Sequence, residues 1–258
     1  MHKGCFNKKK QIMIWVLLFS LIFGKSDSPL ANPKHQKHIK KVVKDENRQS
    51  QILEITKKFK DDVKTLKSLS KGEARSFGKM NKNWETENEE FERIFSLVLE
   101  NRRIFQEKGI DARVKITPLI LDNEWNDYLM FADNAWDKEA KSRKKTLKKL
   151  NKRVDKAERV INNKITSTEN NKSAINYINS FRGTLIQVKK EYSEINSYGN
   201  DILRNRHATR NELIEHAEKM NSLRIELHGS FLESRQGIKD LTTEDQWNSI
   251  AKSINNIF

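Results

Sequence analysis

The sequence has few of the residues that turn a chain or cross-link it. Its 258 residues include 9 glycines, 3 prolines and one cysteine, Cys5. This is too little turn chemistry for a protein of many short strands, and a single cysteine excludes an internal disulfide. Hydrophobic residues make up only 36% of the chain and charged residues 33%. This balance fits a thin core between long helices with solvated faces, so the expected fold class is all-α.

Only one long apolar run is present, and it lies near the N-terminus. The lysines at 8–10 precede residues 12–24, in which Ser20 is the only polar side chain. This order is typical of a secretory signal peptide, which we predict over residues 1–26. As a helix the run would rise about 20 Å, short of the ~30 Å core of a bilayer, which favours cleavage over an N-terminal anchor. Both alternatives predict an exported protein of the periplasm or cell envelope, anchored by residues 12–24 if cleavage does not occur.

Two helices and a connector are predicted for the first half of the remaining chain. Prolines and polar residues make residues 27–37 a tether. Apolar residues at steps of three and four predict one helix from near His38 and a second that ends at Gly109. Together these helices form a helical hairpin over residues 38–109. Residues 110–121 contain strand-like alternation and a proline, and are predicted to be a connector.

A narrower apolar seam runs through the second half of the chain. Asp122 is expected to cap a very long helix, and a polar turn at 166–173 leads into a return helix. A third helix opens with a capping box at Thr209. Two apolar positions in seven are typical of coiled-coil packing. Residues 122–258 are therefore predicted to form a coiled-coil-like three-helix bundle with a short terminal helix that starts at Thr243.

The sequence carries no catalytic or metal-binding pattern that we recognise. GxxxxGK[ST], GxGxxG, GxSxG and HExxH are all missing. The best metal fragment is Glu212 with His216, four residues apart on one helix face, and two ligands do not make a site. A surface pair on a charged helix explains them more simply. We therefore expect a protein that is not an enzyme, with no cofactor and no metal.

The most basic stretch, which we call the basic arm, covers residues 138–159. Lysine and arginine far outnumber the acids Glu139, Asp155 and Glu158 in it. These cations either keep a narrow apolar seam soluble or contact an anionic membrane surface or envelope polymer. A nucleic-acid partner is disfavoured, because the arm has no aromatic residue on which bases would stack. The candidate contact residues are Lys141, Lys144, Lys145, Lys148, Lys149 and Lys152.

Two similar segments each place a tryptophan just inside a helix start. They are Leu121 to Trp125 and Leu241 to Trp247. An indole offers a large apolar area and one hydrogen-bond donor, so Trp125 and Trp247 either belong to the core or form a junction or partner contact. The second segment, after a long helix rich in Lys, Arg and Glu, resembles the C-terminal end of an uncharacterised family of exported, helix-rich bacterial proteins. The resemblance covers residues 120–258, and the family brings no known activity.

These features lead to two functional hypotheses. The first is a non-enzymatic envelope protein whose helical seams make it a structural, scaffolding or partner-binding module, or let it self-associate. The alternative is a peripheral binder of anionic lipid or envelope polymer through the basic arm. The formal net charge of +15 is compatible with both, because it favours anionic partners without naming one.

Overall fold

The computed structural model describes residue 30 and residues 34–255, without the side chains at 66–75, 131–150 and 196–200. Every regular element in these residues is helical, which confirms the all-α fold class. The predicted signal peptide and most of the tether lie outside this part of the chain. The elements are α2 (His35–Val42), α3 (Glu46–Met80), α4 (Asn88–Ile116), the 3-10 helix η2 (Thr117–Leu119), α5 (Asp122–Lys164), α6 (Thr168–Arg204), α7 (Arg210–Asp240) and α8 (Glu244–Ile254).

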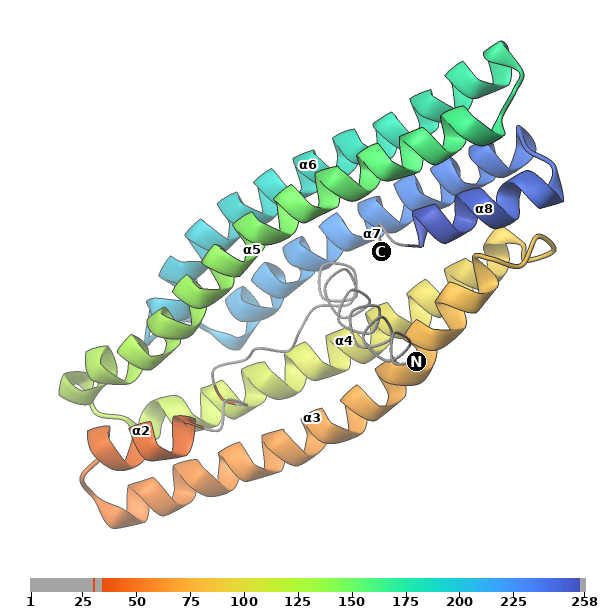
Figure 1. Ribbon diagram of the computed structural model, residues 1–258. Coiled ribbons are helices and arrows are strands. Elements are labelled where there is room, and N and C mark those ends of the chain that lie inside the picture. The colour runs from red at the N-terminus through yellow and green to blue at the C-terminus, as the bar shows by residue number, and fades with distance from the viewer. Residues whose placement is uncertain (1–29, 31–33, 256–258) are drawn as a thin grey trace, which may run out of the picture.

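Long helices set the shape of the molecule. Figure 1 shows α3 to α7 lying roughly along one axis, with α2 at one end and α8 at the other. The longest helix, α5, has 43 residues and therefore extends about 65 Å. The molecule is an elongated helical bundle.

Two predicted capping boxes are confirmed. Glu212 accepts the N–H of Thr209 at 2.7 Å at the start of α7, and Gln246 accepts that of Thr243 at 2.9 Å at the start of α8. The predicted cap of α5 is one residue off. The N-cap is Leu121, whose N–H donates to the carboxylate of Glu124 at 2.9 Å, so the helix gains its cap from a side chain in its own first turn.

The connector predicted at 110–121 is mostly helix. The second helix does not end at Gly109, because α4 continues to Ile116 with Ala112 and Ile116 buried. A Cβ at Gly109 would lie 3.5 Å from the ring of Phe59. An added methyl group would make an ordinary contact there, so Gly109 lies inside α4 without a steric need for glycine, and it is not a C-cap. Only η2 and the residues beside it connect α4 to α5.

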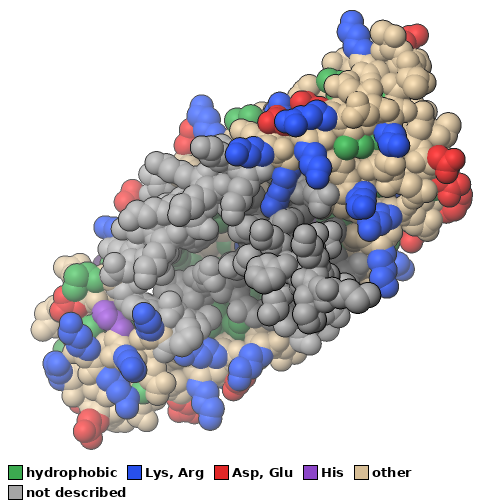
Figure 2. Space-filling view, in the orientation of Figure 1, with side chains coloured by type: hydrophobic (Ala, Val, Ile, Leu, Met, Phe, Trp, Pro, Cys, Tyr) green, Lys and Arg blue, Asp and Glu red, His purple; other side chains and the backbone are tan. Residues whose placement is uncertain are grey.

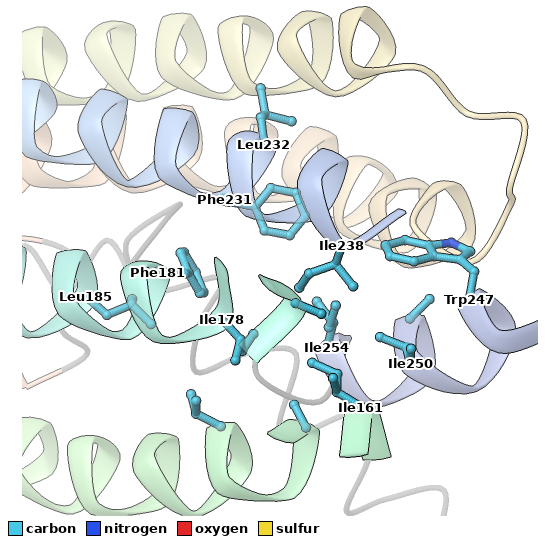
Figure 3. Close-up of a cluster of buried hydrophobic side chains, with 14 of the residues drawn as sticks. Ile161, Ile178, Phe181, Leu185, Phe231, Leu232, Ile238, Trp247, Ile250 and Ile254 are labelled. Carbon is cyan, nitrogen blue, oxygen red and sulfur yellow. The ribbon is translucent and has the colours of Figure 1, made fainter. Parts of the chain in front are cut away.

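The predicted three-helix bundle is part of a larger assembly of helices. As expected, α6 packs against α5 and α7, but α7 also packs against α4, and α8 packs against α5. One large apolar cluster joins residues from α3 to α8; its aromatic members are Phe77, Phe91, Phe95, Phe181, Phe231 and Trp247. Figure 3 shows its α5, α6, α7 and α8 side chains pointing into one core. The predicted hairpin and bundle are therefore not separate units.

A second apolar cluster lies at the opposite end of the bundle. It joins Ile39 and Val43 at α2 to Ile52 on α3, Ile116 on α4 and Trp125 on α5. All of these side chains are at most 7% exposed. The two clusters hold the two ends of the molecule, and helices α3, α4 and α5 contribute to both.

Gly237 and Gly229 form a matched pair on α7. A Cβ at Gly237 would lie 2.3–2.5 Å from ring atoms of Tyr177, whereas a Cβ at Gly229 meets nothing within 4 Å. We expect Gly237→Ala to destabilise the fold by about 1–3 kcal/mol, because the partly buried Tyr177 ring must move. Gly229→Ala should stabilise it by about 0.5–1 kcal/mol through helix propensity. Urea unfolding of both variants measures the difference, and equal effects would contradict this packing of α6 on α7.

Candidate functional site

The structure describes only one of the candidate lysines of the basic arm. Lys152 is exposed on α5. The other five belong to the same helix, but their side chains lie outside the described part. In the described end of the arm, Arg182 of α6 pairs with both Asp155 and Glu158. Two of the three acids of the arm are thus engaged by a neighbouring helix.

The two tryptophans lie in different cores. Trp125 is 7% exposed and belongs to the cluster around α2, while Trp247 is fully buried in the larger cluster. Each indole N–H donates to a backbone carbonyl, from Trp125 to Arg204 at 2.8 Å and from Trp247 to Asn81 at 3.1 Å. The structure does not bring them together in one junction, and both indoles are used inside the protein.

A buried polar network surrounds Trp247, at the end where the α3–α4 turn meets α7 and α8. Asn81, which is fully buried, donates from its amide to Asn255 at 2.7 Å and accepts from Arg235 at 3.1 Å. The guanidinium of Arg235 also donates to the carbonyl of Thr86 at 2.9 Å. We call these residues the Arg235 network. It ties segments that are far apart in sequence into one joint.

The guanidinium of Arg235 contacts neutral hydrogen-bond acceptors and the faces of aromatic rings. Its side chain is 1% exposed, and the guanidinium lies 4.4 Å from the ring centroid of Phe91 and 5.4 Å from that of Trp247. Burial lowers the pKa of Arg235 to about 10, partly opposed by Glu87 and Glu90. The group therefore remains a cation at neutral pH. A buried cation with these contacts fixes geometry at the joint.

More polar side chains follow along the interior of α7. Asn221, His228 and Arg235 recur at intervals of seven and are all buried. Asn221 donates to Gln106 of α4 at 2.8 Å, and the His228 ring stacks on Phe95 with centroids 4.0 Å apart. This helix is buried against α4 and α6 at once, and its polar interior residues contact specific partners on those helices.

Backbone carbonyls organise the opposite end of the molecule. Arg113 of α4 donates to the carbonyls of Leu203 at 2.8 Å and Asn205 at 2.9 Å, at the C-terminal end of α6. This is where a cation complements the helix dipole. Arg206 donates to the carbonyl of Ile120 at 2.7 Å and pairs with Asp122. The turn between α6 and α7 is thereby fixed to the α4–α5 connection.

A pocket of about 310 Å³ opens beside these arginines. Its lining includes Arg113, Thr117, Arg206, His207 and Arg210. Three cations could attract an anion, but Arg113 and Arg206 hold carbonyls, as described above. Arg210 pairs with Asp111 at 2.8 Å. The arrangement serves the joint between helix ends, and we assign no ligand to it.

Metal, membrane and family comparisons give no assignment. Among the described residues there is no group of three or more His, Cys, Asp or Glu that could hold a metal ion, and no helix long and apolar enough to span a membrane. On α7, His216 is buried while Glu212 is exposed, so the expected surface pair has only one exposed member, and the Glu212 carboxylate accepts the N–H of the N-cap residue Thr209. Comparison of the chain with protein-family models, curated proteins and solved structures finds no match.

Sequence reasoning missed the Arg235 network and the polar interior of α7. The apolar positions of α7 form the predicted two-in-seven seam, and that pattern alone places the polar residues between them on the solvent side of the helix. The interval of seven between Asn221, His228 and Arg235 was an available signal, because it keeps the three on one side of a helix. Their partners on α3, α4 and α8 were not visible in any local pattern.

Buried histidines should make the protein sensitive to acid. Burial lowers the pKa of His35 to about 4 and, with help from Arg224, that of His228 to about 3, from an ordinary value of 6.5. Below pH 6.5 the unfolded chain therefore binds protons that the folded chain does not, and the free energy of unfolding falls with pH. At pH 5 the loss should be about 2 kcal/mol for each histidine.

Urea unfolding at pH 7.5 and pH 5 measures this dependence. His228→Phe keeps an aromatic ring against Phe95 and should remove about 2 kcal/mol of the difference between the two pH values. His207→Gln is the control, because His207 is exposed, and it should leave the difference unchanged. If His228→Phe retained the whole pH dependence, the buried, neutral state of His228 would be wrong.

Proposed function

We propose that this protein is a non-enzymatic scaffold of the cell envelope, a stiff helical rod that holds a partner or a second copy of itself at a set position. The observation that carries the proposal is the polar joint at each end of the bundle. At one end, the Arg235 network links the α3–α4 turn to α7 and α8. At the other end, Arg113 and Arg206 link the α6–α7 turn to the α4–α5 connection.

These joints support a mechanical function because they resist sliding between helices. Apolar seams alone allow helices to shift by a turn, since one leucine-sized contact resembles the next. A shift at Arg235 would leave a buried guanidinium without its acceptors, which costs about 3–5 kcal/mol. Rods with fixed ends are suited to spacing and support. The arginines at each joint form their hydrogen bonds with other groups of the protein.

A partner-binding role is supported by apolar side chains on the outside of the bundle. Leu97 on α4 is 46% exposed and Ile225 on α7 is 49% exposed. Leu97 follows Phe95 by two residues and Ile225 precedes His228 by three, and the Phe95–His228 stack joins these two helices. Exposed apolar residues that belong to neighbouring helices are suited to contact with another protein. The location in the envelope rests on the apolar run at 12–24 and is part of the proposal.

A second candidate function is peripheral binding of anionic lipid or envelope polymer through the basic arm. Its support is the pairing of Asp155 and Glu158 with Arg182, which leaves the lysines of that region with fewer acids to offset them. Lys152 is exposed in this segment. Here the rod would lie along an anionic surface.

The rod should hold one distance between its ends. Spin labels at the exposed residues Lys44, just after α2, and Asp245, at the start of α8, measure this distance once Cys5 is replaced by serine. Figure 1 shows these two helices at opposite ends of the molecule. We expect a single narrow distribution for the wild-type chain. Arg235→Met should broaden it, because Asn81 and Thr86 lose their donor. Arg103→Met, which removes an exposed pair with Glu218, is the matched control and should not broaden it. A broad wild-type distribution would contradict the scaffold.

If the exposed apolar side chains bind a partner, Ile225 should cross-link to it. A photoreactive amino acid in place of Ile225 should give one discrete adduct in the native envelope, because an exposed apolar contact is buried by the partner. The same residue at Glu233, also exposed on α7, is the control. An adduct of twice the chain's own mass would identify a second copy as the partner. Absence of an adduct, or the same smear from both positions, would contradict the partner-binding role.

A further inference from the structure

Helix α2 carries its lysines on one side only. Its opposite side is anchored in the core, where His35, Ile39 and Val43 are fully buried. A helix advances about 100° per residue, so the lysines at 34, 37, 40 and 41 fall within an arc of about 120° that faces away from these anchors. The lysine face consists of Lys34, Lys37, Lys40 and Lys41, together with Lys44 in the turn that follows α2, and all five are exposed.

The lysine face is held at one end of the rod. Helix α2 packs against α3 and α5, and a ring nitrogen of His38 lies 2.9 Å from the carbonyl oxygen of Asp127 on α5. Figure 2 shows Lys and Arg side chains gathered at the end of the molecule that α2 occupies in Figure 1. The lysines therefore project from a fixed helix, and they are presented together.

Few acids offset this charge. No Asp or Glu occurs between Asp27 and Asp45 in the sequence. Near the face, Asp45 caps α3, and Glu124 is paired with Arg48 at 2.7 Å. Asp45 keeps its charge as a cap, and Glu46 and Asp127 are exposed nearby, so three carboxylates against five lysines leave a net positive charge. The lysine face is a compact cationic surface.

The candidate lysines of the basic arm are a second one-sided set. They recur at alternating steps of three and one residues, which places them within an arc of about 140° over three turns of α5. They lie along the middle of a long helix, whereas the lysine face lies at one end of the rod. A flat anionic surface can be approached by only one side of a helix at a time. Residues confined to one side, as on α2, can all approach it together.

We propose that the lysine face of α2 docks this end of the rod on an anionic lipid bilayer. A bilayer is favoured as the partner by the chain that precedes α2. The apolar run ends at Gly24, ten residues before Lys34, and an extended chain of that length reaches at most about 35 Å. Where the run is kept as an N-terminal anchor, the bilayer that holds it therefore lies within reach of the lysine face, and the proposal rests on this anchored alternative. This goes beyond the scaffold function, and either can fail without the other.

The test measures binding of the full chain to vesicles of neutral phosphatidylcholine and to vesicles that also contain phosphatidylglycerol. Insertion of residues 12–24 contributes to both, so the readout is the ratio of the two affinities. We expect wild type to prefer the anionic vesicles and to lose this preference in high salt. The triple variant Lys37→Gln, Lys40→Gln, Lys41→Gln should reduce the ratio by about 100-fold, since each lysine near such a surface contributes about a factor of 5.

The matched control is the triple variant Lys148→Gln, Lys149→Gln, Lys152→Gln in the basic arm. It removes the same charge and should reduce the ratio by less than about threefold. The reason is that Lys148 lies 21 residues, or about 30 Å, along α5 from Asp127, which contacts α2. These lysines therefore stay beyond a Debye length from a bilayer docked at the α2 end. Unchanged helicity by circular dichroism shows that both variants are folded. An equal or larger loss in the arm variant overturns the proposal, and so does a wild-type chain with no preference for anionic vesicles. Binding to soluble polyphosphate without binding to vesicles also overturns it.

Discussion

The arrangement of the helices depends on one buried cation, Arg235. Burying its guanidinium costs the free energy of its hydration. Hydrogen bonds to Asn81 and Thr86 and contact with the aromatic rings offset this cost only when all of these partners are in place. Buried charged groups add little net stability compared with apolar packing of the same volume. They do penalise every arrangement in which the acceptors are missing. Arg235 therefore selects one register of α7 against the α3–α4 turn from many that apolar packing would accept.

The same constraint explains why α7 is the central helix. It is buried against α6 on one side and α4 on the other, so it cannot keep a single apolar stripe. Polar residues such as Asn221 and His228 occupy interior positions because they meet Gln106 and Phe95 there. At the other end of the molecule, Arg113 and Arg206 donate hydrogen bonds to backbone carbonyls and so hold the second joint. The result is a rod whose two ends are specified by polar contacts and whose length is given by helices.

The charge of the protein is arranged differently inside and outside. Arg235 and Arg224 are buried and serve the interior, so they contribute little to any contact with an anion. Carboxylates such as Glu215, Glu226 and Glu233 lie exposed on α7. The lysines of α2 form a separate cationic face at one end. A formal net charge of +15 is therefore not spread evenly, and an anionic surface and a protein partner can meet different parts of the rod.

The sequence by itself determined the helices, because their signals are local. Capping residues such as Thr209 and Thr243, the spacing of apolar residues and the scarcity of glycine and proline act within one or two turns. The prediction of a helix end at Gly109 was wrong because a glycine that ends a helix and one inside a helix look the same in sequence. Tertiary structure decided which clusters hold Trp125 and Trp247, which partners meet Arg235, and that the side of α2 opposite its lysines is buried against α3 and α5. Each depends on contacts between residues that are far apart along the chain, and no local pattern encodes them.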